Sequence, residues 1–389
     1  MARLAVNGIA LNVEVWPSPP GPPSPFGPPS PPDPWLTGPL AAVNGPARLS
    51  LPAGEGEPPI KVSASVLSPR VQWEGVGRDT SGCDTGGGLP SPASGRAEWA
   101  VGPRVGPRDQ SAWGGGEGRP TLLLLHGFTG SAASWRGHVA TLTRYATVVA
   151  VDLIGHGNSD APADPARYTM AHCIADLLAA LDHLGIAHVV ALGYSMGARV
   201  ALRLAAAAPD RVAALILESG SPGLATEEER EARRAADAAL ATRIEQDGVD
   251  KFVDCWEAIP LFATQRGLPA PVRDRLRRQR LRNSATGLAN SLRGMGTGTQ
   301  EPLWDRLGTI MLPALLVAGA LDEKFCVIGC AMAAAMPRAD LAVVPGAGHT
   351  THVEQPAEFD QLVTGFLQSQ GNVWAQEETG RGKGSRQCQ

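Results

Sequence analysis

The stretch Gly193-Tyr194-Ser195-Met196-Gly197 decides the fold of this 389-residue chain. It follows an apolar run at residues 188–192, typical of a buried strand, and precedes a helix-like segment at residues 198–207. A serine between two glycines at a strand-to-helix turn is the nucleophile-elbow pattern, in which a tight turn raises the hydroxyl above the sheet. The pattern therefore predicts an α/β sheet with Ser195 as its reactive residue.

A serine hydroxyl becomes a nucleophile or a base only when a histidine accepts its proton. In this architecture the partners follow along the chain in the order acid, then histidine. Asp322 comes after the strand-like residues 314–319, and His349 comes after the strand-like residues 341–345. Because open α/β sheets build their sites at the carboxyl ends of strands, we expect both side chains to meet Ser195 there.

Three other residues compete for these roles. Glu218 also ends a strand-like run and is an alternative acid, while His352 and His156 are alternatives to His349. His156 lies in a Gly-His-Gly loop of the kind that more often shapes a pocket wall, and His352 is expected to support its loop.

The fourth component of such a site is an oxyanion hole. The apolar run at residues 121–125 leads into His126-Gly127-Phe128-Thr129-Gly130. The backbone N–H of Phe128, together with that of Met196, is expected to hold a developing negative oxygen. The alternative is that these glycines only allow the chain to turn at the end of a strand, with no role in an oxyanion hole.

Composition narrows the class of protein. The chain is 43% hydrophobic with a formal net charge of −4, so it can build a sizeable core and has no global field that favours nucleic acid. Its six cysteines share no motif, and Cys326 and Cys330 lack the companions of a zinc site. Neither a signal-peptide core nor an apolar stretch of about 20 residues is present. We therefore expect a cytoplasmic enzyme that holds no metal and binds neither nucleic acid nor a membrane.

From residue 120 strand and helix patterns alternate, which predicts a mainly parallel sheet covered on both faces. A long segment rich in Pro, Gly and Ser precedes this part and cannot offset the entropy of ordering; an SH3-type ligand there is a less favoured interpretation. The expected parts are a β-hairpin at residues 1–16, a disordered insertion at 17–118, the first core half at 119–221, a helical lid at 222–311, the second core half at 312–369 and a flexible tail at 370–389.

The expected lid is rich in arginine. Most of these side chains should line solvated helix faces, and a nucleic-acid patch is a less favoured interpretation. Two or three of them, with Arg199 on the elbow helix, can instead bind carboxylates, because a planar guanidinium does so bidentately. Since a lipase pocket would be apolar, the pattern favours an anionic substrate. The arginines are Arg230, Arg233, Arg234, Arg243, Arg266, Arg273, Arg275, Arg277, Arg278, Arg280 and Arg282.

Together these motifs resemble one family, the 2-succinyl-6-hydroxy-2,4-cyclohexadiene-1-carboxylate (SHCHC) synthases of menaquinone biosynthesis. The resemblance covers residues 1–16 and about 120–367 and implies an α/β-hydrolase fold with a mostly parallel eight-stranded sheet. The Asp-Glu-Lys-Phe run at residues 322–325 completes the family pattern and favours Asp322 over Glu218. The other matching stretches are Gly193 to Arg199, Ser221 to Leu224, His126 to Gly130 and Gly348 to His352.

The resemblance implies a lyase step without a metal or organic cofactor. In it the triad removes a ring proton next to a ketone, and pyruvate leaves a substrate that bears three carboxylates. Arg230, Arg234 or Arg282 could hold the roles that the family pattern gives to Arg233 and Arg280. Trp256 could instead belong to the core of the lid. Ala198 stands where a second glycine is common in the family. The residues that the family pattern assigns to substrate binding are Tyr194, Arg199, Arg233, Trp256 and Arg280.

Two rival functions share parts of this pattern. A serine hydrolase acting on esters or carbon–carbon bonds of anionic substrates would use the same triad, and only the arginines separate it from the lyase. A non-catalytic sensor on this fold would not need an intact triad. Haloalkane dehalogenases and epoxide hydrolases need a carboxylate at the elbow, so Ser195 excludes them.

Overall fold

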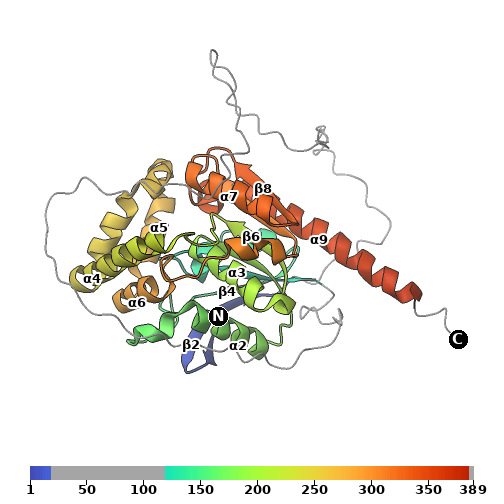
Figure 1. Cartoon of the computed structure of the whole chain (residues 1–389), viewed down its shortest axis with the longest axis horizontal. Helices are drawn as coiled ribbons and strands as arrows, with labels where there is room; N and C mark the ends of the chain where they lie inside the picture. The colour runs from blue at the N-terminus through green and yellow to red at the C-terminus, as the bar shows by residue number, and fades with distance from the viewer. Residues whose placement is uncertain (19–118, 385–389) are drawn as a thin grey trace, which may run out of the picture. The chain divides into compact units, whose positions relative to one another are not determined.

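The computed structural model describes residues 1–18 and 119–384 (Figure 1). The insertion expected at residues 17–118 lies outside the described residues except for its first two, and residues 385–389 of the expected tail also lie outside them.

Within the described residues, eight strands form one sheet in the order β1-β2-β4-β3-β5-β6-β7-β8. β2 pairs antiparallel with β1 and β4, and every other pair is parallel. The prediction of a mostly parallel eight-stranded sheet is therefore confirmed. The strands are β1 (Ala2–Val6), β2 (Ile9–Trp16), β3 (Thr121–Leu125), β4 (Thr147–Val151), β5 (Val189–Tyr194), β6 (Val212–Glu218), β7 (Ala314–Gly319) and β8 (Ala339–Val344).

Alternate side chains along the strands belong to two apolar clusters, one on each face of the sheet. Leu123 and Leu125 of β3 belong to the cluster that packs against α2, α3 and α7, whereas Leu122 and Leu124 belong to the cluster that packs against α1 and α9. This alternation follows from the two-residue period of a strand. The helices around the sheet are α1 (Val139–Leu142), α2 (Met170–His183), α3 (Met196–Ala207), α7 (Glu323–Ala335), α8 (Thr351–Glu354) and α9 (Pro356–Gly384), with short 3₁₀ turns η4 (Ala132–Trp135), η5 (Pro165–Tyr168) and η6 (Pro209–Arg211).

The N-terminal hairpin turns at Asn7 and Gly8, whose φ angles of 46° and 82° are both positive. A two-residue turn of this kind matches the right-handed twist of the flanking strands, and Asn-Gly is its preferred sequence. At the other end of the chain, α9 continues to Gly384, through most of residues 370–389, where the sequence analysis expects a flexible tail. No proline follows Leu367 to stop the helix.

The lid segment, residues 222–311, joins β6 to β7 and consists of helices. They are α4 (Glu227–Ala258), η7 (Pro260–Gly267), α5 (Ala270–Leu281), α6 (Ala285–Met295) and η8 (Trp304–Thr309). Helix α4 is broken at Gly248, where φ is 83° and ψ is 169°. Figure 1 shows α4, α5 and α6 grouped at one side of the sheet. A small apolar core of their own, which includes Ile244, Val253 and Leu288, holds them together.

Candidate active site

Ser195 stands at the turn between β5 and α3 in a strained backbone conformation. Its φ of 51° is positive, which is rare for a residue with a side chain. A Cβ atom on Gly193 would lie 2.2 Å from the carbonyl oxygen of Gly197, and one on Gly197 would lie 2.1 Å from the carbonyl oxygen of Leu125. The turn therefore closes only with glycine at both positions, as the elbow pattern requires.

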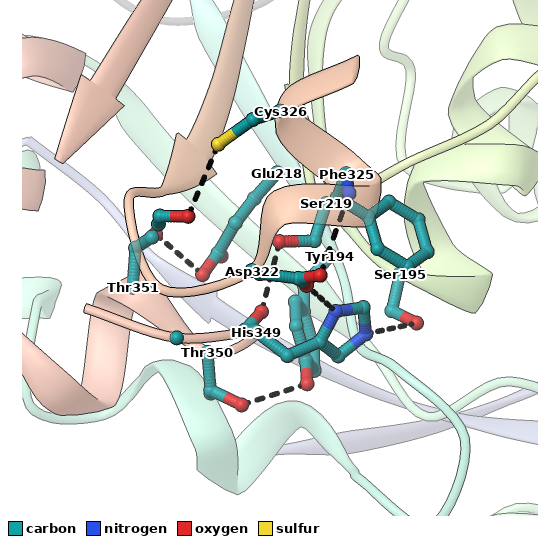
Figure 2. A network of polar contacts seen from close by, with 12 residues as sticks. Tyr194, Ser195, Glu218, Ser219, Asp322, Phe325, Cys326, His349, Thr350 and Thr351 are labelled. Carbon is teal, nitrogen blue, oxygen red and sulfur yellow. Dashed lines mark hydrogen bonds and ion pairs between the residues drawn. The ribbon is translucent and has the colours of Figure 1, made fainter. Parts of the chain in front are cut away.

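The structure brings Ser195, His349 and Asp322 together (Figure 2). The His349 Nε2 atom lies 3.1 Å from the Ser195 Oγ atom, and its Nδ1 atom lies 2.7 Å from the Asp322 Oδ2 atom. Asp322 and His349 are 8% and 2% exposed. Because the carboxylate accepts the Nδ1 proton, Nε2 is left free to accept the serine proton.

The alternative acid and histidines lie elsewhere. Glu218 is fully buried and accepts hydrogen bonds from the Thr351 hydroxyl at 2.6 Å and from His352 Nδ1 at 2.8 Å. Burial alone would raise the pKa of Glu218, but the contacts with His352 and Thr351 outweigh it, and the pKa is lowered. His156 packs its ring 5.8 Å from the ring of Phe128. The three alternatives thus surround the triad without joining it.

Three side chains near the triad escaped the sequence analysis. Ser219 donates from Oγ to the carbonyl oxygen of His349 at 2.9 Å, and its own φ of 48° is positive. Thr350 pairs its hydroxyl with the Tyr194 hydroxyl at 2.8 Å (Figure 2). Gln265 of η7 donates to the same Thr350 hydroxyl at 2.9 Å. Thr350 lies in the family-matching stretch Gly348 to His352 but has no role assigned there, and no motif marks Ser219 or Gln265. Their roles depend on the meeting of distant loops.

The loop of Phe128 is fixed by His126. The His126 Nδ1 atom lies 2.8 Å from the carbonyl oxygen of Gly127, and Nε2 accepts from the N–H of Leu153 at 3.0 Å. Burial lowers the pKa of His126 to about 4, so the ring is neutral near pH 7. Met196 is the first residue of α3, where N–H groups have no acceptor within the helix. These positions suit the predicted oxyanion role.

The two aromatic residues expected to bind substrate, Tyr194 and Trp256, both pack against other aromatic rings. The Trp256 ring lies 5.4 Å from Phe128, at the boundary between the lid segment and the core. Tyr194 lies 5.5 Å from the His349 ring, and burial raises the pKa of its hydroxyl.

Two of the predicted arginines are buried, and the third is half-exposed. Arg199 donates to the carbonyl oxygen of Met295 at 2.9 Å and to Gln300 at 2.8 Å. Burial, followed by the nearby charge of Arg233, lowers the pKa of Arg199 to about 10. Arg233 donates from Nε to Asp237 at 2.8 Å. Burial raises the pKa of that carboxyl group despite the arginine.

Arg280 of α5 is 8% exposed. It donates to Glu257 at 3.1 Å and to Gln265 at 2.9 Å, and its guanidinium carbon lies 5.1 Å from the centre of the Phe262 ring. The Phe262 ring in turn lies 6.2 Å from the ring of His349. One aromatic ring of the lid segment, Phe262, thus neighbours both a buried cation and the triad histidine.

Several other lid arginines pair with lid carboxylates. The pairs are Arg230 and Arg234 with Glu227, Arg277 with Asp254 and Glu257, and Arg293 with Glu245. These pairs are partly exposed and stabilise the lid rather than present free cations to a ligand.

The described part of the chain contains no group of three or more His, Cys, Asp or Glu side chains that could hold a metal ion. None of its helices combines the length and the apolar character that crossing a bilayer requires.

A serine at the β5–α3 turn of this sheet is hydrogen-bonded to a histidine that follows β8, and an aspartate that follows β7 binds the other side of that histidine. This arrangement defines an α/β-hydrolase-fold enzyme. Residues 120–356 match the family model described as alpha/beta hydrolase fold. The chain is 33% identical over 254 residues to a 2-succinyl-6-hydroxy-2,4-cyclohexadiene-1-carboxylate synthase of Serratia proteamaculans, covering 65% of this chain and 95% of the relative. It is 45% identical over 248 residues to a Bacillus subtilis protein that bears the same name provisionally, covering 64% and 90%.

Among solved structures, MenH from S. aureus superimposes with a TM-score of 0.62 at 37% identity, covering 64% of this chain and 94% of that one. The chain belongs to the SHCHC synthase family of α/β-hydrolase-fold enzymes.

Proposed function

We propose that this chain is a carbon–oxygen lyase of menaquinone biosynthesis. It releases pyruvate from 2-succinyl-5-enolpyruvyl-6-hydroxy-3-cyclohexene-1-carboxylate and forms SHCHC. Beyond family membership, one observation carries the proposal: two buried arginines lie in the same part of the molecule as the triad. Arg280 packs on Phe262, whose ring lies 6.2 Å from that of His349, and Arg199 stands on α3, the helix that follows Ser195. Arg199 and Arg280 are 9% and 8% exposed. A substrate with three carboxylates suits such a site, because guanidinium groups bind carboxylates bidentately.

The proposed reaction begins when His349 accepts the Ser195 proton. The serine oxygen then removes the ring proton next to the ketone. The electron pair of that C–H bond moves through the enolate and the ring alkene, and the carbon–oxygen bond to the enolpyruvyl group breaks. The departing enolpyruvate takes up a proton and becomes pyruvate, so no redox partner and no metal or organic cofactor is needed. Asp322 stabilises the imidazolium that forms.

The enolate oxygen carries the charge that develops in this step. The N–H groups of Phe128 and Met196 are proposed to donate to it. Support comes from the position of Met196 at the start of α3, where backbone N–H groups and the helix dipole favour negative charge. Donors that are already in place need no reorganisation during the reaction.

The proposed carboxylate ligands are Arg199, Arg233 and Arg280, and Tyr194 and Trp256 are proposed to line the ring. Arg199 and Arg233 both lie near Asp237, so their charges are partly balanced before substrate binds. A polycarboxylate would supply the remaining negative charge. This arrangement favours a polyanionic small molecule over a neutral ester.

The test is a pyruvate assay with the enolpyruvyl cyclohexene as substrate. Wild-type protein should release one pyruvate per substrate, and Ser195→Ala should be slower by at least about a thousandfold. If wild type releases no pyruvate but forms a stable acyl-enzyme with an activated ester, the chain is a serine hydrolase of anionic substrates and the lyase proposal is wrong.

The cytoplasm is the proposed location. The described cysteines Cys173, Cys255, Cys326 and Cys330 are all free thiols, which is typical of a reducing compartment.

A further inference from the structure

The loop that carries His349 is held from two sides. On the sheet side, Ser219 donates to the carbonyl oxygen of His349, and Glu218 accepts from Thr351 (Figure 2). Glu218 also accepts from His352. All these groups are buried and belong to the core or to the loop itself. The sheet side is therefore a fixed attachment that does not involve the lid segment.

On the lid side, one residue among those that the structure describes reaches the loop with a hydrogen bond. Gln265 is 6% exposed and donates from Nε2 to the Thr350 hydroxyl at 2.9 Å. Its Oε1 atom accepts from Arg280 Nη2 at 2.9 Å. The Thr350 hydroxyl also meets the Tyr194 hydroxyl at 2.8 Å. One continuous chain of hydrogen bonds thus runs from Arg280 through Gln265 and Thr350 to Tyr194.

Three members of this chain adjoin residues with a role in the reaction or have a proposed role of their own. Thr350 is the neighbour of His349 in the sequence, and Tyr194 is the neighbour of Ser195. Arg280 is a proposed carboxylate ligand, and its other hydrogen bond goes to Glu257 at 3.1 Å.

An amide side chain suits the middle position for a chemical reason. Guanidinium N–H groups only donate, so the group facing Arg280 has to accept. The Thr350 hydroxyl receives a donated proton on its other side. Glutamine offers an acceptor and a donor on one planar group, and the reversed amide would set N–H against N–H. The network therefore specifies both the residue type and its orientation.

We propose that Gln265 is a positioning residue that couples carboxylate binding at Arg280 to the placement of the His349 loop. A bound carboxylate orients the guanidinium, the guanidinium orients the Gln265 amide, and the amide holds Thr350 and hence the imidazole over Ser195. Misplacement of a catalytic group by about 1 Å can cost roughly a hundredfold in rate, so a short chain of this kind has a measurable effect. The inference rests on the proposed function only in naming the carboxylate at Arg280.

The main experiment is a double-mutant cycle on kcat for pyruvate release with Gln265→Met and Arg280→Met. We expect Gln265→Met alone to lower kcat by about tenfold. In the Arg280→Met background, the same substitution should lower kcat less than about threefold, because the chain is already broken. Equal factors in the two backgrounds would overturn the proposal.

The matched control is Ser219→Ala, which loosens the same loop from the sheet side. Its effect on kcat should be the same in wild type and in Arg280→Met, since the hydrogen bonds of Ser219 go to His349 and Val317 and not to the lid. If Ser219→Ala shows the same coupling to Arg280 as Gln265→Met, the coupling is not specific to the lid side and the proposal is wrong.

Thr350 provides the second pair of variants, should Gln265→Met fold poorly. Thr350→Val removes the hydroxyl at nearly constant volume and should reproduce the loss, while Thr350→Ser retains the hydroxyl and should restore kcat to within about threefold of wild type. A Thr350→Val enzyme with wild-type kcat would contradict the proposal.

A measurement without the substrate separates this proposal from the proposed function. The rate at which a neutral fluorophosphonate labels Ser195 reports the placement of His349 whatever the natural reaction is. Gln265→Met and Thr350→Val should both slow labelling by about tenfold. Absence of pyruvate release with this slowing would refute the lyase assignment alone. Unchanged labelling rates in both variants would refute the positioning role.

Discussion

The sheet and the lid segment are held together in different ways. Side chains such as Leu122 to Leu125 of β3 are fully buried, and each contributes about 1.5–3 kcal/mol by leaving water. The lid has a smaller apolar core and many partly exposed arginine pairs, each worth only about 0–1 kcal/mol. The difference indicates a division of labour. The triad residues come from the ends of the sheet strands, and three of the five proposed substrate ligands, Arg233, Trp256 and Arg280, come from the lid.

The largest expected effect lies on the sheet side. Asp322→Asn should lower kcat by roughly ten-thousandfold, because the amide favours the wrong histidine tautomer at Nδ1. The measurement is steady-state pyruvate release. Glu218→Gln is the matched control: it changes another buried acid nearby but should leave kcat within about tenfold of wild type while it lowers the melting temperature. Loss of activity in Glu218→Gln comparable to that in Asp322→Asn would remove the distinction between the two acids.

The second effect concerns acid stability of the core. Burial lowers the pKa of His126 to about 4 and that of His156 to about 3, whereas the unfolded value is near 6.5. Below pH 6.5 the unfolded chain therefore binds protons that the folded chain does not. Stability should fall as the pH drops from 6.5 toward 4, by roughly 2 kcal/mol per histidine at pH 5.

Urea unfolding at pH 7 and pH 5 tests this expectation. His156→Gln should remove about half of the pH dependence, while His183→Gln, at an exposed position, should leave it unchanged. Equal free energies of unfolding at the two pH values in wild type would show that the buried histidines do not set the acid limit.

The third effect lies where the core meets the lid. Lys324 places its Nζ atom 5.4 Å from the centre of the Phe325 ring, and that ring lies 4.6 Å from the ring of His349. Desolvation, followed by the charge of Arg233, lowers the pKa of Lys324 to about 8. The ammonium group is charged below this pH and neutral above it. The KM for the polyanionic substrate should therefore rise by about three- to tenfold between pH 7 and pH 9.

Lys324→Arg stays charged over this range and should show a nearly constant KM. A KM profile that is the same in wild type and in Lys324→Arg would mean that Lys324 does not contribute to substrate binding.

The smallest effect lies within the lid. Gly248 has a φ of 83° and a ψ of 169° at the break in α4, and an added Cβ would meet no atom within 4 Å. Gly248→Ala should therefore cost about 1 kcal/mol through backbone strain alone. Gly267 also has open space but no positive φ, so Gly267→Ala should be neutral in the same denaturation assay. A neutral Gly248→Ala would show that the break relaxes without cost.

The sheet and the triad could be predicted from the sequence because their signals are local. Apolar runs mark the strands, glycines mark the elbow, and Asp322 and His349 each follow a strand. The fold rule then brings strand ends together without any knowledge of loops. The end of α9 was harder to predict from the sequence, since no residue there forbids a helix.

The contacts of the lid could not be predicted from the sequence in the same way. Sequence shows that arginines are abundant, but whether a given arginine faces a carboxylate of the lid depends on helix rotation and packing. Arg233 with Asp237 is a helical pair at a spacing of four, whereas Arg280 with Gln265 joins two separate helices. Ser219, Thr350 and Gln265 likewise acquire their roles only where loops meet.

The register of β2 and β3 on β4 determines where a segment inserted between these two strands joins the sheet. Trp16 pairs with Val148 and Thr121 pairs with Thr147, so the chain leaves β2 and re-enters at β3 beside the same point of β4. That point is the amino end of β4, at the margin of the sheet opposite the catalytic one. Joining such neighbouring ends adds only a logarithmic entropy with length. A segment inserted at this junction therefore leaves the chain at the edge of the sheet opposite the catalytic residues.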